Sequence, residues 1–267
     1  MKTVIIRGGL GNQLFGLAFA DTVAQVSGRP VRLDLSSYNH DPHGRVFETA
    51  DLAAEYGLDM SAEIPPPRPR LMQRLFSKPP VRIRIVEPRP PFDEGTIDTI
   101  VRTGDVFDGY WQNARWFDRP DVVRERTRVF LERLGDGALR HDVVIHHRIY
   151  HEERLPGRMR GPGPQYFENA LRQLEQWYGP LHDIAAISNR RGIREEAYGA
   201  FDDRVTRYVG SPASDMALML NARYLVLTNS SFSWWGGYCG DAERVIYPSR
   251  GKYFHYPIPS RRFHIIE

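Results

Sequence analysis

The sequence predicts an α/β fold built on parallel sheets of the nucleotide-binding kind, and two observations lead to this prediction. Residues 3–35 have the pattern of a strand, a helix and a second strand, which together make one β–α–β unit. The second half of the chain alternates short apolar segments with helical segments four or five times. Such a rhythm is typical of a parallel sheet with crossover helices.

The first β–α–β unit is defined by apolar periodicity and by glycine. Residues 3–6 are apolar, and the glycine-rich turn at residues 8–11 follows them. From residue 13 to residue 26 the apolar positions recur with the spacing of a helix packed on a sheet, and Gly28 ends this helix. Residues 30–35 are the second strand.

The middle of the chain is irregular and basic. Nine of the 20 prolines lie between residues 65 and 91, where they alternate with arginines. We interpret this segment as a solvated surface loop around a short strand at residues 81–86, and the alternative is contact with a membrane surface or with the acceptor.

A helix and a chain break close the first half. Residues 110–113 have the pattern of a strand end, and Pro120 opens a helix that runs to about residue 134. The break at Gly135-Asp136-Gly137 then places the domain boundary, which gives an N-terminal domain of residues 1–137 and a C-terminal domain of residues 138–267. The elements expected in the second domain are strands at 142–146, 183–188, 205–209, 223–228 and 244–247, and helices at 164–178, 192–199, 213–221 and after residue 231.

Composition excludes several classes of protein. The hydrophobic fraction of 41% and charged fraction of 26% are those of a globular protein, and no run reaches the roughly 20 apolar residues of a membrane span. Met1-Lys2 leads straight into a strand, so we expect a cytoplasmic protein. The one cysteine, Cys239, allows no internal disulfide and no cysteine metal cluster. We see no metal site and no nucleic-acid-binding motif. The sequence pI near 9.0 suits phosphate-bearing ligands or an anionic lipid surface.

The first candidate binding segment follows the apolar run at residues 224–227. Its pattern is that of a turn from a buried strand into a helix, where backbone amides can bind a phosphate. Serine hydroxyl groups add further donors to these amides, and the side chains of Phe232, Trp234 and Trp235 can exclude water from the site. The alternative is a capped core helix with buried aromatic residues. The residues assigned here to substrate binding are Asn229, Ser230, Ser231, Phe232 and Ser233.

The second candidate is the turn that contains Gly9, Gly11, Asn12 and Gln13. Its glycines allow a substrate to approach the backbone, and its two amide side chains are available for hydroxyl groups. A nicotinamide-binding enzyme is an alternative, with Asp34 as the ribose ligand, but Leu14 stands where the dinucleotide fingerprint has its third glycine.

Two further candidates lie in the second half. Arg148 comes just after a strand end, where its planar guanidinium can hold two phosphate oxygens. His146 can contact a base or ribose, or can be an ordinary strand-end histidine. Asp215 at the start of a helix can be part of an N-terminal cap, or its carboxylate can accept hydrogen bonds from a guanine edge.

Taken together, these segments resemble the bacterial α-1,2-fucosyltransferases of glycosyltransferase family 11. The motifs that carry the resemblance are Gly8-Gly9-Leu10-Gly11-Asn12-Gln13-Leu14-Phe15, Leu33-Asp34-Leu35-Ser36-Ser37-Tyr38, Tyr110-Trp111-Gln112, Asp215-Met216-Ala217-Leu218-Met219 and Asn229-Ser230-Ser231-Phe232-Ser233-Trp234-Trp235-Gly236. They occur in the family's order and span nearly the whole chain.

The resemblance implies a GT-B architecture, in which two Rossmann-like domains face each other across a cleft. The first domain is then expected to hold the acceptor, with Gly9 to Gln13 near the fucose, and the second to hold GDP-fucose. The resemblance also implies metal-independent transfer of L-fucose to a galactose-type hydroxyl, with inversion at the anomeric carbon and with no cofactor. Arg148 and the turn at residues 231–233 would hold the diphosphate, while His146 and Asp215 would recognise guanosine.

One motif departs from the family pattern. The family has histidine, any residue, two arginines, glycine and aspartate, whereas this chain has His146-His147-Arg148-Ile149-Tyr150-His151. The change leaves the donor sugar open, so one alternative is a transferase that uses another GDP-6-deoxyhexose or a natural-product or lipid-linked acceptor. A second alternative is a non-catalytic relative that binds a nucleotide or a glycan. The candidates for the general base are Glu152, Glu153 and His151. We assign Glu153, together with Arg148, as catalytic.

Overall fold

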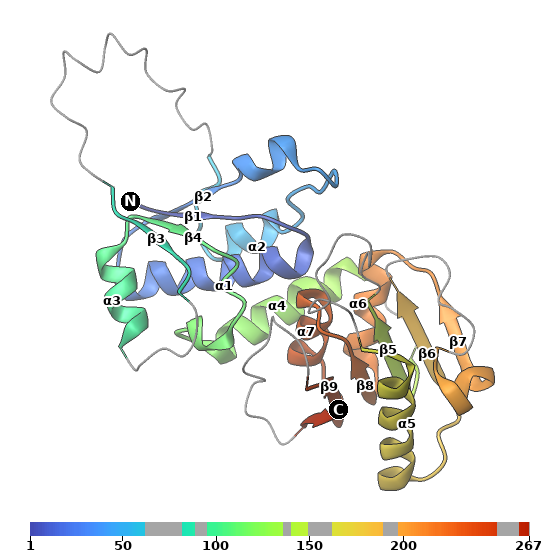
Figure 1. The fold of residues 1–267 in the computed structure, drawn as a ribbon. Helices are drawn as coiled ribbons and strands as arrows, with labels where there is room; N and C mark the ends of the chain where they lie inside the picture. Colours follow the sequence, from blue (N-terminus) through green and yellow to red (C-terminus); the bar gives the residue numbers. More distant parts are fainter. Residues whose placement is uncertain are drawn as a thin grey trace, which may run out of the picture. The chain divides into compact units, whose positions relative to one another are not determined.

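The computed structural model describes residues 1–61, 82–88, 95–135, 140–148, 162–188, 197–249 and 262–266. They form two compact units, Met1–Val123 and Arg124–Glu267. Each unit is built around a sheet in which all paired strands are parallel (Figure 1). The predicted α/β fold class is therefore confirmed. Within the described ranges, no helix has both the length and the apolar character needed to cross a membrane.

The first unit has a four-stranded sheet in the order β2-β1-β4-β3. Its strands are β1 (Lys2–Ile5), β2 (Val31–Asp34), β3 (Arg84–Val86) and β4 (Val106–Asp108), and its helices are α1 (Leu10–Ser27), α2 (Ala50–Glu55) and α3 (Thr96–Thr103). The β–α–β unit predicted at the N-terminus is present. Sequence analysis missed β4, α2 and α3, and the segment expected to be a strand end at residues 110–113 lies beyond the end of β4.

Helix α1 is the centre of the first unit, because its residues from Leu10 to Val23 are buried on almost every side. A helix that is apolar all round belongs inside a protein, not on its surface. The ring of Phe19 stacks on that of Trp111, with centroids 3.8 Å apart, and meets Phe107 and Trp116 edge-on at 5.5 and 5.8 Å. This aromatic cluster joins α1 to the segment that follows β4.

The second unit has a six-stranded sheet in the order β10-β9-β8-β5-β6-β7. Its strands are β5 (Val143–His147), β6 (Ile184–Ser188), β7 (Val205–Tyr208), β8 (Tyr224–Leu227), β9 (Arg244–Pro248) and β10 (Phe263–Ile266). Its helices are α4 (Pro120–Leu134), whose first turn falls in the other unit, α5 (Pro164–Tyr178), α6 (Pro212–Asn221) and α7 (Ser231–Cys239). All five predicted strands are present, and β10 was not predicted.

The two faces of this sheet bury different helices (Figure 1). Val143 and Ile145 of β5 pack in the core cluster that contains the apolar side of α5. His146, one position along the strand, points to the opposite face, where its ring lies 5.6 Å from that of Phe232 in α7. Because side chains alternate between the faces of a strand, the same strand supplies both the core and a functional residue.

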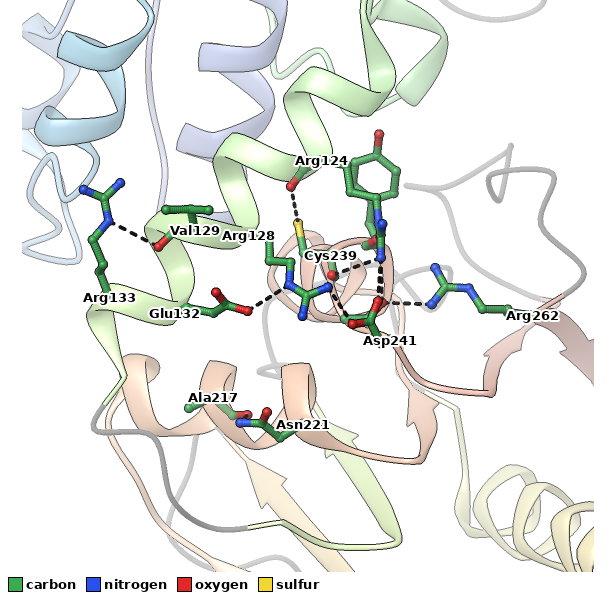
Figure 2. Close-up of polar contacts among 12 residues, drawn as sticks. Arg124, Arg128, Val129, Glu132, Arg133, Ala217, Asn221, Cys239, Asp241 and Arg262 are labelled. Carbon is green, nitrogen blue, oxygen red and sulfur yellow. Dashed lines mark hydrogen bonds and ion pairs between the residues drawn. The ribbon is translucent and has the colours of Figure 1, made fainter.

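A polar cluster fixes α4 against the C-terminal end of α7 (Figure 2). The Arg124 guanidinium donates to the carbonyl oxygens of Tyr238, Cys239 and Gly240 at 2.9, 3.4 and 3.3 Å, and it pairs with Asp241 at 2.9 Å. The last carbonyl groups of a helix have no partners inside the helix, so a cation is favourable there. Arg124 thus supplies both the hydrogen bonds and the charge.

These bonds explain why the described chain divides within α4, between Val123 and Arg124. The boundary placed after Gly137 stays a prediction, because residues 136–139 lie outside the described residues. Most of the proline-rich segment also lies outside them, as does the first part of the helix expected at 192–199. Residues 199–204 form a short 3-10 helix.

Candidate functional site

The carboxyl end of the second sheet gathers most of the predicted donor-site residues. β5 and β8 are neighbours in this sheet and run parallel. The residues that follow them, at 146–148 and at 228–233, therefore emerge at the same edge, and Asp215 near the start of α6 follows β7 at that edge. Ligands of open α/β sheets bind at this edge, because loops and helix N-termini converge there.

Thr228 ties the two central loops together. Its hydroxyl donates to the His146 carbonyl oxygen at 3.0 Å and accepts from the Arg148 amide at 3.0 Å. The backbone on both sides of His147 is thereby fixed to the loop after β8, which sets the direction in which Arg148 leaves the sheet. Sequence analysis did not assign a role to Thr228; its position directly after a buried strand, beside a candidate loop, is the signal that was available.

His146 is buried and neutral. Its side chain is 3% exposed, and within the described part of the chain its Nδ1 atom has no hydrogen-bond partner. Burial, together with the nearby Arg148 charge, lowers the pKa of His146 to about 3. A buried ring nitrogen without a partner is costly, so it is a group that a bound ligand can satisfy.

Asp215 has a similar environment. It is 7% exposed, and its Oδ1 atom has no hydrogen-bond partner among the described residues. Burial raises the pKa of Asp215 to about 6. The N-terminal cap of α6 is made instead by Ser211 and Ser214, whose side chains and backbone amides bond each other reciprocally. The structure therefore separates the two alternatives for this segment: the cap does not use the Asp215 carboxylate.

The loop after β8 supplies the start of α7. The first intrahelical bond joins the Trp234 amide to the Ser230 carbonyl at 3.0 Å, so the amides at 231–233 have no acceptor within the helix. Ser231 and Phe232 are partly exposed, whereas Ser233 is fully buried. Amides at such a helix start can bind an anion, and the Ser231 hydroxyl lies among them.

Several predicted ligands have structural roles here. The Ser233 hydroxyl donates to the carbonyl oxygens of Thr228 and Ser230 at 3.1 and 3.2 Å, which stabilises the turn from within. The Asn229 side-chain oxygen accepts from the Tyr247 hydroxyl at 3.1 Å. Trp234 and Trp235 are 2% and 0% exposed and pack on each other. The two tryptophans therefore belong to the core, as the alternative interpretation of this segment expected.

The glycine-rich turn lies at the carboxyl end of the first sheet. Gly9 caps α1 with an extended backbone, and Gly11 lies in the first turn. The left-handed conformation that requires glycine occurs at Gly8, whose φ is 86°. The Asn12 side-chain oxygen accepts from Gln112 Nε2 at 2.6 Å.

Gln13 was predicted to be available for a substrate hydroxyl, and the structure shows a different role. Its Nε2 atom donates to the carbonyl oxygens of Gly8 and Val46 at 3.1 and 2.7 Å, and its Oε1 atom accepts from the Glu48 amide and the Thr49 hydroxyl at 2.8 and 3.4 Å. These bonds use the full capacity of a side-chain amide. The fully buried Gln13 therefore holds the loop at 46–49 against the glycine turn.

The structure describes only part of the predicted catalytic pair. Arg148 is described and partly exposed, whereas Glu153 and the divergent residues 149–151 lie outside the described residues. In the part of the chain that is described, no group of three or more His, Cys, Asp or Glu side chains is arranged to hold a metal ion. Asp34, considered as a ribose ligand, accepts from the Ser36 amide at 3.0 Å.

Sequence comparison finds a curated relative that aligns with most of the chain. The chain is 28% identical over 270 aligned positions to an alpha-1,2-colitosyltransferase of Escherichia coli, an alignment that covers 89% of this chain and 88% of that protein. No protein-family model matches the chain. The similarity supports the resemblance to bacterial glycosyltransferases of the fucosyltransferase kind.

Solved fucosyltransferase structures show a weaker likeness. The fucosyltransferase NodZ from Bradyrhizobium is 15% identical with a TM-score of 0.47, and 95% of this chain aligns with 97% of that one. FUT1 of Arabidopsis thaliana in complex with GDP is 12% identical with a TM-score of 0.44, over 94% of this chain and 70% of that chain. Because both TM-scores are below 0.5, the comparison with known proteins rests on the sequence similarity alone.

Proposed function

We propose that the protein is a GDP-sugar-dependent glycosyltransferase that transfers L-fucose, with inversion and without a metal, to a galactose-type hydroxyl of a glycan in α-1,2 linkage. The observation that carries the proposal is the set of groups at the carboxyl edge of the second sheet. His146 and Asp215 each have a buried polar atom without a partner among the described residues. Arg148 and the start of α7 lie at the same edge.

The proposed donor contacts follow from the chemistry of GDP. A guanine edge offers paired N–H donors, and the Asp215 carboxylate is an acceptor with one oxygen that has no partner among the described residues. The neutral His146 ring can bond a base or ribose. The diphosphate carries the negative charge, which the Arg148 guanidinium and the amides at 231–233 would balance.

The proposed reaction is a direct displacement. The acceptor oxygen forms a bond to C1 of the sugar while the bond from C1 to the β-phosphate oxygen breaks, and that electron pair leaves with GDP. The transition state resembles an oxocarbenium ion, as in glycoside hydrolysis. Arg148 and the α7 amides would stabilise the charge that develops on the leaving diphosphate. Glu153 is the proposed acceptor of the hydroxyl proton, and the departing phosphate is the alternative.

A second donor is favoured by a specific observation. The Escherichia coli relative is named for transfer of colitose, and residues 149–151 differ from the fucosyltransferase pattern. The same site can therefore serve GDP-activated colitose or another 6-deoxyhexose in place of fucose. The acceptor, the cytoplasmic location and the contact of the basic proline-rich segment with a membrane surface stay predictions.

A thermal-shift series with GDP, UDP, CDP and NAD tests the nucleotide first. We expect stabilisation by GDP alone, of about 2.7 kcal/mol when GDP is present at about 100 times its dissociation constant. Loss of one charge-assisted phosphate contact costs about 1.5–3 kcal/mol, so Arg148→Ala should weaken GDP binding by roughly 10- to 100-fold.

Arg223→Ala is the matched control, because Arg223 is exposed, pairs with Glu243 and precedes β8 at the opposite end of the same sheet. A rise in melting temperature with NAD but not with GDP would instead favour the alternative in which the glycine-rich turn binds a nicotinamide dinucleotide. Incubation of the enzyme with GDP-fucose or GDP-colitose and a β-galactoside then identifies the donor.

A further inference from the structure

The loop after β4 has an unusual backbone that the proposed donor chemistry does not use. Trp111 has a φ of 54°, the one non-glycine residue with positive φ in the described chain. This conformation is rare and unfavourable for a bulky residue, so neighbouring contacts must stabilise it. The Trp111 side chain is fully buried and stacks on Phe19.

The Glu87 carboxylate provides that stabilisation. Its Oε2 atom accepts from the amides of Tyr110 and Trp111 at 2.7 and 2.8 Å. Gly109 makes room for it, since a Cβ at this position would lie 2.7 Å from that same oxygen. Burial raises the pKa of Glu87, whereas the backbone hydrogen bonds favour its charged form. The partly buried Glu87 carboxylate therefore fixes the backbone of the loop after β4.

The fixed loop presents two side chains at the carboxyl edge of the first sheet. Tyr110 is 43% exposed, and its ring lies 6.0 Å from the Arg7 guanidinium carbon. Gln112 reaches Asn12 in the glycine turn, with Nε2 2.6 Å from Oδ1. β1 and β4 are neighbours in the sheet, so this hydrogen bond joins the two loops that follow them.

We propose that Tyr110 and Gln112 form a sugar-acceptor subsite with Asn12, and that Glu87 is the positioning residue of this subsite. The proposal rests on the proposed transferase function and assigns the acceptor. An exposed aromatic ring and amide side chains at the same edge of a sheet fit a pyranose, which has an apolar C–H face and hydroxyl groups at its rim. A non-reducing galactoside is the ligand class.

Saturation-transfer NMR with methyl β-D-galactopyranoside tests the subsite on the full chain. We expect binding to the wild type, at least tenfold weaker binding to Tyr110→Ala and Gln112→Ala, and GDP affinity within twofold of wild type in both. Tyr178→Ala is the matched control, because Tyr178 has a similar exposure of 37% but lies on α5 of the other unit. Unchanged galactoside binding in Tyr110→Ala, or no binding to the wild type, overturns the proposal.

The role of Glu87 has its own readout. Glu87→Ala should weaken galactoside binding as much as Tyr110→Ala does, whereas Glu87→Gln should restore most of it, because a glutamine oxygen can accept the same amide hydrogens. Equal loss in both Glu87 variants contradicts the positioning role. Failure of GDP to bind the wild type while the galactoside binds would refute the proposed function and leave a glycan site in the first unit.

Discussion

At the scale of single residues, the site depends on polar groups that are buried without partners in the described chain. His146 and Asp215 are the two examples at the carboxyl edge of the second sheet. Each raises the free energy of the unliganded protein, because burial removes water without supplying a hydrogen bond in exchange. At such a position stability and ligand binding have opposite requirements, so a substitution can raise the stability of the protein and weaken ligand binding.

Asp215→Asn should show this separation through its pH dependence. The pKa of Asp215 is about 6 in the folded protein, above the ordinary value of 3.8. Between these two values the unfolded chain loses the proton while the folded chain keeps it, so stability falls as pH rises from about 4 to 6 and then levels off.

The Asp215→Asn variant is neutral at this position and has no such penalty. It should gain about 1–3 kcal/mol relative to wild type at pH 8 and little at pH 4, while GDP binding weakens at least tenfold. Urea unfolding at both pH values and calorimetric titration of GDP measure the two effects. A variant that binds GDP like the wild type would remove Asp215 from the site.

Gln13→Ala tests the opposite case, a predicted ligand that the structure assigns to stability. The substitution leaves the Val46 carbonyl and the Glu48 amide without their side-chain partner. We expect a loss of about 2–4 kcal/mol in the free energy of unfolding. Gln25→Ala is the control, since Gln25 is exposed on the same helix with one long bond of 3.4 Å to Asp21. Equal urea midpoints for both variants would contradict this assignment.

At the scale of elements, α7 has a function at each end. Its N-terminus contributes the amides at 231–233 to the candidate site, and its C-terminal carbonyls are bonded by Arg124 of α4 (Figure 2). A second arginine, Arg262, donates to the Gly240 carbonyl at 2.8 Å. The position of the candidate site therefore depends on contacts at the other end of the helix.

Arg124→Ala should destabilise the second unit by about 1–3 kcal/mol, because several carbonyl groups at the end of α7 lose their donor. Arg128→Ala is the control on the same helix. Arg128 has a similar side-chain exposure but pairs only with the exposed carboxylates of Glu132 and Asp241 in the described chain, and exposed pairs contribute about 0–1 kcal/mol. Chemical denaturation followed by tryptophan fluorescence compares them. Equal losses in the two variants would show that the ion pair to Asp241, and not the capping of α7, is what matters.

At the scale of the whole molecule, the two units carry the candidate sites for two different ligands. Each unit has its own parallel sheet, and each sheet places its candidate residues at the carboxyl edge. The groups differ in kind: the second unit offers an arginine, a helix start and buried titratable side chains, whereas the first offers an exposed tyrosine and amides. This difference is what a nucleotide donor and a sugar acceptor require.

Hydrogen exchange should therefore show two separate footprints. GDP should slow exchange at residues 144–148, 210–216 and 228–234, and methyl β-D-galactopyranoside should slow it at residues 7–13 and 108–113, because bound ligands suppress local opening. Protection of the glycine turn by GDP would contradict the assignment of the nucleotide to the second unit.

The local pattern of the sequence determined most of the secondary structure. Alternation and helical periodicity predicted the first β–α–β unit and five strands of the second unit, because these segments bury apolar side chains at regular spacing. The three-residue strand β4 shows the limit of this approach, whereas β3, which is equally short, was predicted within residues 81–86. A short strand has too few positions for a pattern, so the strand at β4 was missed and its loop was taken for a strand end.

The roles of individual polar residues were decided by tertiary structure. Nothing in the sequence around Gln13, Ser233 or Glu87 states which distant backbone groups they bond, because those partners are brought together only when the sheets and loops pack. The sequence by itself determined the α/β class, the order of the motifs and the edge of each sheet at which they lie. Which polar atoms are used up within the protein, and which are left for a ligand, depends on burial and on partners far away in the chain, and only the folded structure supplies both.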